Sequence, residues 1–462
     1  MRNRPTNEQF RKQLKDLVDT LRREISEGVY AQAGKLPPEK LLAARFGLSN
    51  NSVRKGLEQL VEEGLIEKVP RVGNRVRQAQ AGREPVELTI GCYPAALRSL
   101  ELTVLLEDIQ RQFPWISIRV KTDIGVPEIA ENVDVVLIDH FQFWQMVEIG
   151  RVSCFEALSS EGAAGVYPQL KELFVHEGRN WLRPIIFSPI VLCYNKAHFR
   201  ECGLEEPDGS WTWSELIRAA ERLSDSKGRY GFSVRIQDIN RWPIFLLQSG
   251  ERFEWEPDGR LKELRGTRLL ESIKACKNII HNRKASPLFF YESNGDALEL
   301  FMEGRLSMVL NSYMGLNVWK HADLDYDVTP MPFLYEPRTL LICLGAGVCA
   351  GSRHKEEARR IVDYLGSPRA RDLIAKHTLT LPALRPLPAS VRGGVRRPER
   401  YNLYREMMFS YRTHRDLNIP SAAFPKLLQQ LRMYWADLID EDELCERIGA
   451  ALSAFSPQLA AR

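Results

Sequence analysis

The sequence predicts an α+β module over residues 1–77 and a larger α/β body over residues 86–462. Three observations support this division. Between residues 36 and 76, helical periodicity gives way to the strict alternation of a β-hairpin. After residue 86, segments typical of strands are separated by segments with helical periodicity, which favours an α/β fold. The basic surplus is confined to the first module, with 16 Lys and Arg against 10 Asp and Glu, whereas the rest has 48 against 50.

The first module begins with two helices. A capping box over residues 6–9 precedes an amphipathic helix whose apolar face runs to Ile25, and this helix ends near Gly28. A short helix follows Pro37, and its side chains Leu41, Leu42 and Phe46 can face a core.

A third helix is predicted from Asn50 to Glu63, because Ser49 is a good N-cap and apolar residues recur at a period of 3.6. Its buried stripe consists of Val53, Leu57, Leu60 and Val61. Asn50 and Arg54 then lie one turn apart on the exposed face, where their side chains match the edges of adenine and guanine. This arrangement suits a recognition helix.

A basic hairpin is predicted after Gly64, because residues 65–76 alternate in hydropathy. Lys68, Arg71 and Arg75 of this hairpin can reach phosphates or the minor groove. Helix, turn, helix and basic hairpin together predict a winged helix-turn-helix that binds double-stranded DNA. The alternative is a small helical subdomain whose charges only solvate a surface.

The same stretch resembles the GntR family of bacterial transcription regulators. The matching residues are Leu36, Pro37, Glu39, Lys40, Gly47, Ser49, Val53, Arg54, Leu60, Gly64, Leu65, Ile66 and Gly73. Pro38, Asn50 and Arg71 depart from the family pattern, so the usual operator sequence is not carried over. The resemblance implies DNA contacts at Lys40, Asn50, Asn51, Ser52, Arg54 and Gly73. Paired half-sites are usual for such heads, so a homodimer is expected.

Residues 78–85 lack periodicity and end in a proline, which indicates a linker. In the body, strands are predicted at 86–90, 116–120 and 133–138, with a helix at 100–113. This order predicts a mostly parallel sheet. Ligands bind beyond the carboxyl ends of such strands, which points to Tyr93 and to the segment beginning at Asp139.

Longer motifs resemble the extracellular solute-binding proteins of sugar ABC transporters. They are Tyr194-Asn195-Lys196 with Gly203-Leu204, then Trp211-Thr212-Trp213-Ser214-Glu215-Leu216, and later Gly345-Ala346-Gly347-Val348 with Ser352-Arg353-His354-Lys355. The resemblance covers about residues 86–390. It implies a two-lobed body of the periplasmic-binding-protein-like type II fold, with crossing segments between the lobes. A sugar or oligosaccharide would lie between the lobes and close them by a hinge motion.

Sugar sites combine aromatic faces with a few placed polar groups. The ligand-binding candidates are therefore Tyr93, Asp139, His140, Trp144, Arg241, Trp242 and Tyr313. Each aromatic has a structural alternative: Trp144 in a core, Trp242 as a helix cap, and Tyr313 on a lobe surface. Tyr194 and Asn195 are expected to serve the hinge, and Trp211 and Trp213 to pack.

No cofactor or metal is expected, because the eight cysteines have no C-x-x-C spacing and no pairing with histidines. They are expected to be small buried thiols. No apolar run is long enough for a membrane helix, and the N-terminus has no apolar signal core, so a cytoplasmic protein without a membrane partner is expected.

These observations favour a DNA-binding regulator whose body senses a small solute, and they leave the effector, the operator and the sign of regulation open. One alternative is a GntR-type regulator with a pyridoxal-phosphate aminotransferase-like body, whose Schiff-base lysine loop is not found; residues 224–228 look like a turn. A hydrolase is disfavoured because its motifs are missing, and a transport protein because no signal peptide precedes the head. The basic loop at 391–397 could touch DNA or be solvated.

Overall fold

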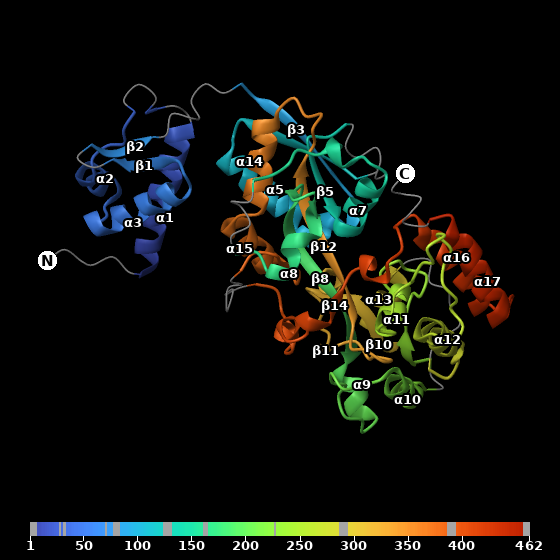
Figure 1. Cartoon of the computed structure of the whole chain (residues 1–462). Coiled ribbons are helices and arrows are strands. Elements are labelled where there is room, and N and C mark those ends of the chain that lie inside the picture. The colour runs from blue at the N-terminus through green and yellow to red at the C-terminus, as the bar shows by residue number, and fades with distance from the viewer. Residues whose placement is uncertain are drawn as a thin grey trace. The chain divides into compact units, whose positions relative to one another are not determined.

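The computed structural model describes residues 7–26, 29–30, 34–69, 72–76, 84–122, 132–159, 165–225, 228–285, 294–385 and 394–455 (Figure 1). The chain forms two compact units, Met1–Glu87 with Glu107–Ile118 and Leu88–Leu106 with Arg119–Arg462. The predicted 78–85 linker lies mostly outside the described residues.

The N-terminal head has the predicted order of elements. Three helices, α1 (Asn7–Ser26), α2 (Glu39–Phe46) and α3 (Asn50–Glu62), precede a hairpin of β1 (Ile66–Val69) and β2 (Gly73–Val76). The hairpin is antiparallel, with Ile66 opposite Val76. The head therefore has the winged helix-turn-helix arrangement.

The core of the head forms where α1, α2 and α3 meet. Leu17, Leu42 and Val53 are fully buried there, as the helical stripes predict. The expectation that Leu41 faces this core is wrong: Leu41 is 62% exposed, because a helix as short as α2 buries only one face. Gly56 permits close packing, since a Cβ there would lie 2.7 Å from Leu17 Cδ2.

The body is built on a mixed sheet of ten strands among the described residues. Its main path is β4-β3-β5-β12-β8-β10-β9, with β11 and β13 paired to β8 and β14 paired to β12. The strands are β3 (Val86–Cys92), β4 (Ile116–Lys121), β5 (Val135–Asp139), β8 (Arg183–Asn195), β9 (Tyr230–Ser233), β10 (Leu306–Ser312), β11 (Tyr326–Thr329), β12 (Thr339–Val348), β13 (Leu381–Pro382) and β14 (Tyr411–Arg412). A separate small hairpin joins β6 (Val175–His176) and β7 (Arg179–Asn180).

The prediction of a mostly parallel sheet is wrong. β3 and β5 are parallel, as are β9 and β10, but the central strands β8 and β12 are antiparallel to each other. β12 is also antiparallel to β5, and β8 to β10. The prediction failed because it used only the first strands of the body, whereas the central pair comes from the middle of the chain.

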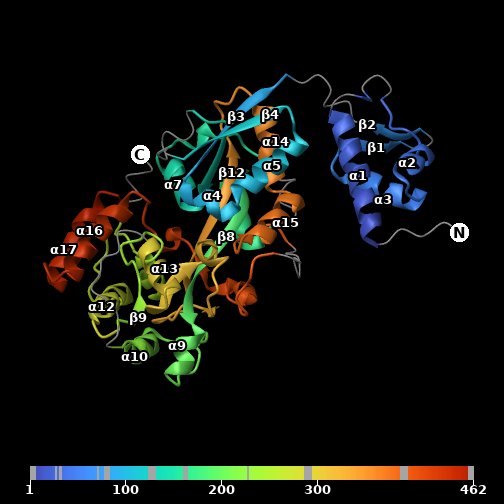
Figure 2. The same ribbon diagram turned by 180° about the vertical axis from the view of Figure 1, so that it is seen from behind.

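Two strands carry the chain between the two lobes of the body (Figures 1 and 2). The first part of β8, through Pro189, pairs with β12, and its last part, from Ile190, pairs with β10 and β11. β12 pairs with β14 at Thr339 and with β5 from Leu344 onward. These are the crossing segments that the sequence predicted.

Helices cover both lobes. Those of the first lobe are α4 (Pro94–Leu100), α5 (Leu102–Gln112), α7 (His140–Glu148), α8 (Pro168–Lys171), α14 (Lys355–Leu365) and α15 (Pro368–His377). Those of the second lobe are α9 (Lys196–Glu201), α10 (Trp213–Leu223), α11 (Trp242–Gln248), α12 (Arg268–His281), α13 (Asn294–Met302), α16 (Ala423–Trp435) and α17 (Glu441–Ser453). The single helix expected at 100–113 is interrupted at Glu101, whose φ is +48°.

The C-terminal helices complete the core of the second lobe, as predicted. Phe424, Leu427 and Leu431 of α16 are buried in one cluster with Leu270 and Ile273 of α12. Figure 2 shows α16 and α17 beside α12.

All eight cysteines are free, and six of them are buried, which fits the thiols expected from the sequence. Among the described residues, no helix has the length and apolarity required to cross a membrane. Within the same part of the chain, no group of three His, Cys, Asp or Glu is placed to hold a metal.

Candidate functional site

The candidate DNA-binding face of the head is formed by α3. Ser49 caps this helix, because its Oγ accepts a hydrogen bond from the Ser52 amide at 3.2 Å. Asn50, Asn51 and Arg54 are exposed on the first turns of the helix. The structure therefore places these three candidates where a DNA groove could reach them.

Ser52 differs from its neighbours on α3. It is only 8% exposed, and its hydroxyl lies 2.8 Å from the Ser49 hydroxyl inside the cap. The expectation that Ser52 contacts DNA is therefore corrected, because the Ser52 hydroxyl contacts the capping residue Ser49 in the structure.

The other candidates in the head flank α3. Lys40 is exposed on α2, and Arg75 is exposed on β2 of the wing. Gly73 has a φ of +103°, which favours glycine at the wing turn. Arg54 donates its Nε to Glu39 Oε2 at 2.8 Å, so an acidic side chain holds the guanidinium on this face. Arg71 lies outside the described residues.

In the body, Tyr93 and Asp139 lie at the same edge of the sheet. Tyr93 follows β3 and Asp139 is the last residue of β5, and these two strands are parallel, with Cys92 opposite Leu137. Asp139 caps α7 and accepts a hydrogen bond from the Gln142 amide at 2.8 Å. Burial raises the pKa of Asp139 to about 6, and burial and the Asp139 charge raise the pKa of the Tyr93 phenol well above its usual range.

His140 begins α7 and is 2% exposed. Its Nδ1 accepts a hydrogen bond from the Cys343 amide at 3.3 Å, so the proton of the neutral ring belongs on Nε2. Burial, followed by the His414 and Arg415 charges, lowers the pKa of His140 to about 3. Among the described residues, the buried Nε2 has no hydrogen-bond partner. The neutral His140 ring therefore carries an N–H donor at Nε2 that no described residue accepts.

His414 presents the complementary group. It lies in the 3-10 helix η7 (His414–Leu417), and its ring centre is 6.1 Å from that of His140. Its Nε2 donates to the Ile239 carbonyl at 2.9 Å, which leaves Nδ1 as an acceptor without a partner in the described part of the chain. Burial lowers the pKa of His414 to about 4.

Aromatic rings surround these two histidines. Phe141 lies 4.4 Å from the His414 ring centre, and Phe424 lies 5.4 Å from it. Trp242 lies 5.7 Å from Phe424, is 1% exposed, and has no partner for its indole nitrogen within the described ranges. We call His140, Phe141, Trp242, His414 and Phe424 the histidine–aromatic cluster.

Arg241 is the residue before α11 and is only 6% exposed. Its NH1 donates to the Asn240 carbonyl at 3.1 Å. Burial lowers the pKa of this arginine, and the Asp238 charge acts in the opposite direction. Arg241 is thus a buried cation beside Trp242 at the border of the histidine–aromatic cluster.

Trp144 and Tyr313 do not belong to this cluster. Trp144 donates its indole N–H to the Leu173 carbonyl at 3.0 Å. Tyr313 is fully buried, and its hydroxyl donates to the Tyr401 carbonyl at 2.9 Å. The expectation that Tyr313 contacts a ligand is therefore corrected, because the strand β10 that precedes it directs the ring into a core of tyrosines.

Sequence reasoning missed His414 and Phe424. They follow residue 391, where the resemblance weakens, and neither stands in a motif. The Thr413–Asp416 capping box marks a helical turn there, but a turn does not identify a site.

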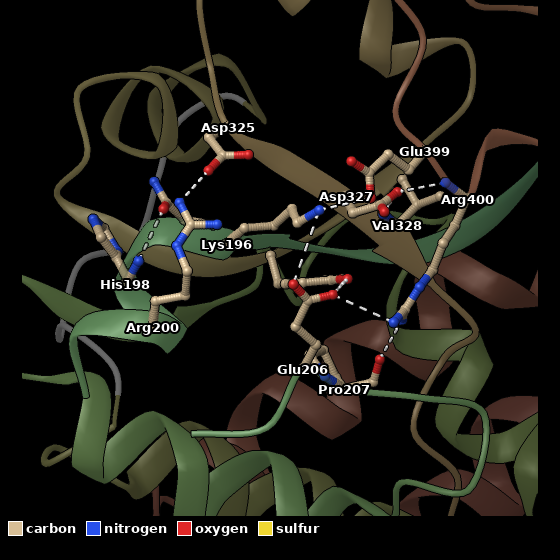
Figure 3. Close-up of polar contacts among 12 residues, drawn as sticks. Lys196, His198, Arg200, Glu206, Pro207, Asp325, Asp327, Val328, Glu399 and Arg400 are labelled. Carbon is tan, nitrogen blue, oxygen red and sulfur yellow. Dashed lines mark hydrogen bonds and ion pairs between the residues drawn. The ribbon is translucent and has the colours of Figure 1, made fainter. Parts of the chain in front are cut away.

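The Tyr-Asn-Lys motif makes structural contacts at the end of β8 (Figure 3). Tyr194 donates to Glu206 Oε2 at 2.7 Å. Lys196 Nζ lies 2.7 Å from Glu399, and Arg400 NH2 lies 3.3 Å from Glu206. These contacts attach the end of β8 to the segment that begins at residue 394.

Two family models match the chain. "Bacterial regulatory proteins, gntR family" covers residues 13–76, and "Bacterial extracellular solute-binding protein" covers residues 130–372. The body therefore resembles solute-binding proteins, and the alternative of an aminotransferase-like body is set aside.

Curated relatives match only a short part of the chain, between 61 and 75 residues. An uncharacterised HTH-type transcriptional regulator of Rhizobium meliloti is 36% identical over 72 residues, which are 16% of this chain and 30% of that protein. The mannosyl-D-glycerate transport/metabolism system repressor of Escherichia coli is 31% identical over 75 residues, which are 16% of this chain and 31% of that protein. The chain thus spans about a third of the length of these relatives.

Solved structures match the body. An ABC substrate-binding protein from Listeria monocytogenes in complex with cycloalternan has a TM-score of 0.67 at 18% identity, over 80% of this chain and 99% of that chain. A maltose/maltodextrin-binding domain from Bdellovibrio bacteriovorus bound to maltotriose has a TM-score of 0.65 at 17% identity, with the same coverage. These likenesses show a two-lobed fold.

Proposed function

The chain belongs to the bacterial extracellular solute-binding protein family and carries a gntR-family DNA-binding domain, and from this premise we propose that it is a sugar-responsive transcription regulator. A sugar or oligosaccharide binds the body and changes the affinity of the head for its operator. The protein acts in the cytoplasm, where the head can reach the chromosome.

The head supports the DNA-binding half of this proposal. Asn50, Asn51 and Arg54 are exposed at the start of α3, and the basic surplus of the chain lies in the first 77 residues. Asn and Arg match the edges of adenine and guanine, and the surplus charge favours phosphate contacts. Operators of such heads are paired half-sites, so we expect a homodimer.

The observation that best supports a sugar effector is the unused donor and acceptor of the histidine–aromatic cluster. A sugar hydroxyl both accepts and donates a hydrogen bond, so it can accept from His140 Nε2–H and donate to His414 Nδ1. The rings of Phe141, Trp242 and Phe424 offer apolar faces for the C–H surface of a sugar ring.

Binding requires the lobes to separate, because both histidines are 2% exposed. His140 belongs to the first lobe and His414 packs on the second, so a hydroxyl held between them would favour one spacing of the lobes. β8 and β12 are the strands about which this spacing can change. A sugar that binds one spacing better would shift operator affinity by about 1–3 kcal/mol.

The first test is the thermal unfolding of the full chain with glucose, galactose, mannose, maltose and maltotriose. A ligand at 100 times its dissociation constant adds about 2.7 kcal/mol of stability, which is readily measured. We expect at least one sugar to stabilise the body and to change the binding of the full chain to DNA selected from a random pool.

A matched pair of variants locates the site. His414→Phe keeps an aromatic ring at this position but removes Nδ1, which would accept the hydrogen bond of the sugar hydroxyl. It should therefore abolish stabilisation by the sugar and preserve DNA binding. His321→Phe, at an exposed position, should preserve both. Stabilisation that survives His414→Phe would place the effector elsewhere, and a panel without any stabilising sugar would contradict the proposed function.

A further inference from the structure

A cavity of about 920 Å³ lies in the body beside the segment 412–418. Its walls come from residues 250–269 of the second lobe, from Arg338 just before β12, and from the 412–418 segment itself. His140, Trp242, His414 and Phe424 are not among the lining residues, so the cavity is distinct from the histidine–aromatic cluster.

Four arginines from three separate segments line this cavity: Arg252, Arg338, Arg412 and Arg415. Within the described ranges, none of them forms an ion pair at 4.0 Å or less with a carboxylate. Arg338 NH1 donates to the Leu247 carbonyl at 3.3 Å, and its buried Nε has no partner in the described part of the chain. Arg412 donates to the Tyr411 carbonyl at 2.8 Å. The guanidinium groups of Arg338 and Arg412 are thus held by neutral carbonyls, and that of Arg415 lies 3.4 Å from the centre of the Trp144 ring.

The carboxylates in the wall are already engaged. Glu254 pairs with Lys262 at 2.8 Å. Asp416 accepts hydrogen bonds from the amide and the hydroxyl of Thr413, and Glu251 accepts one from the Leu269 amide at 3.2 Å. Glu263 pairs with Arg265 at 3.0 Å. The wall carries five basic side chains, the four arginines and Lys262, against four acidic ones, so its formal charge is +1.

Guanidinium groups bind tetrahedral oxyanions through paired N–H donors, and several of them around one cavity fit a doubly charged group better than a single carboxylate. We propose that this cavity binds a small molecule bearing a phosphate group, at a second site separate from that of the sugar effector. The volume exceeds that of a phosphate ion alone, so it also accommodates the organic part of a phosphate ester.

Isothermal titration of the full chain with inorganic pyrophosphate, at constant ionic strength in chloride, tests this site. We expect saturable binding of one pyrophosphate per body. Malonate, a dicarboxylate that carries less charge, should bind at least tenfold more weakly. Malonate binding of equal strength would contradict the preference for phosphate, and failure of pyrophosphate to bind at 10 mM would overturn the site.

Variants test whether pyrophosphate binds in this cavity or at the basic head. Arg338→Gln and Arg252→Gln should each weaken pyrophosphate binding at least tenfold. Arg252 is exposed and has no hydrogen bond or ion pair among the described residues, so its variant keeps the test valid even where Arg338→Gln fails to fold. Arg218→Gln, on the exposed face of α10, and Arg54→Ala, in the head, should leave the dissociation constant within twofold.

Pyrophosphate binding that persists in both cavity variants but is lost in Arg54→Ala would assign the anion to the head and overturn the proposal. The His414→Phe variant should bind pyrophosphate like the unmodified chain, because His414 does not line the cavity. A failed sugar screen would therefore not affect the pyrophosphate result. Failure of pyrophosphate to bind would likewise not affect the result of the sugar screen.

Discussion

The guanidinium carbon of Arg415 lies 3.4 Å from the centre of the Trp144 ring. Trp144 belongs to α7 of the first lobe, whereas Arg415 lies in the segment that leads into the C-terminal helices. A second contact joins the same parts, since Glu148 of α7 accepts a hydrogen bond from the Ser421 amide at 2.7 Å. The 412–421 segment therefore holds α7 at two places.

We expect Arg415→Gln and Trp144→Leu to be energetically coupled. A cation over an indole contributes about 1 kcal/mol, so the double variant should lose about that much less stability than the sum of the single losses. All nine tryptophans lie beyond residue 114, so none belongs to the first 77 residues, and their fluorescence during urea unfolding reports on the rest of the chain. Arg412→Gln serves as the control and should be additive with Trp144→Leu.

The stability of the body should fall as the pH is lowered from 6.5 to 4.5. The pKa of His414 is about 4 in the folded chain and near 6.5 in the unfolded chain, so in this range only the unfolded chain takes up the proton. His140, with a folded pKa of about 3, acts in the same direction. Asp139, with a folded pKa of about 6, opposes them between about pH 4 and 6.

His414→Phe should reduce this loss of stability by about 2 kcal/mol at pH 4.5, because it keeps the ring but removes its titration. The charged or titratable groups near this ring are His140, Asp238 and Arg415. Urea midpoints at pH 6.5 and 4.5 measure the difference. An unchanged pH dependence would show that His414 does not titrate as a buried group.

Gly56→Ala should destabilise the head by about 1–3 kcal/mol, because the new Cβ would lie 2.7 Å from Leu17 Cδ2 and the helices would have to move apart. Amide hydrogen exchange of α1 and α3 measures this loss, while tryptophan fluorescence should show an unchanged body. Gly449→Ala is the matched control, since nothing lies within 4 Å of its added Cβ. It should be neutral or stabilising.

Arg54→Ala should lower the affinity of the full chain for its operator by about 5- to 150-fold, because a bidentate arginine–guanine pair is worth about 1–3 kcal/mol. Gel shifts with DNA selected from a random pool measure this loss, and stabilisation by a sugar should persist. Lys15→Gln, at an exposed position of α1, is the control of equal charge change. Undiminished affinity in Arg54→Ala would show that α3 is not the reading helix.

Local patterns predicted the head almost completely. Capping by Ser49 and the 3.6-residue stripe of α3 are properties of neighbouring residues, and the same is true of the alternation in the wing. Leu41 was misplaced because apolar character alone does not show which face of a two-turn helix is covered.

The histidine–aromatic cluster could be predicted only in part. His140 and Trp242 were found because they follow a strand end and precede an apolar helix. His414 was not found, since its contact with His140 joins residues more than 270 positions apart. Tyr313 was misjudged for a related reason: its partner Tyr401 belongs to a distant segment, and no local signal separates a buried tyrosine from one that faces a ligand.

The pairing of β8 with β12 determines when each part of the chain can fold during its synthesis. The head needs only contacts within its first 76 residues, so it can form while the ribosome is still making the rest. The central ladder joins Ile186 to Leu344, and the second lobe also needs α16, so the body must wait until nearly all of the chain has emerged. A nascent chain therefore passes through a stage in which a folded N-terminal head is attached to a body that has not yet folded.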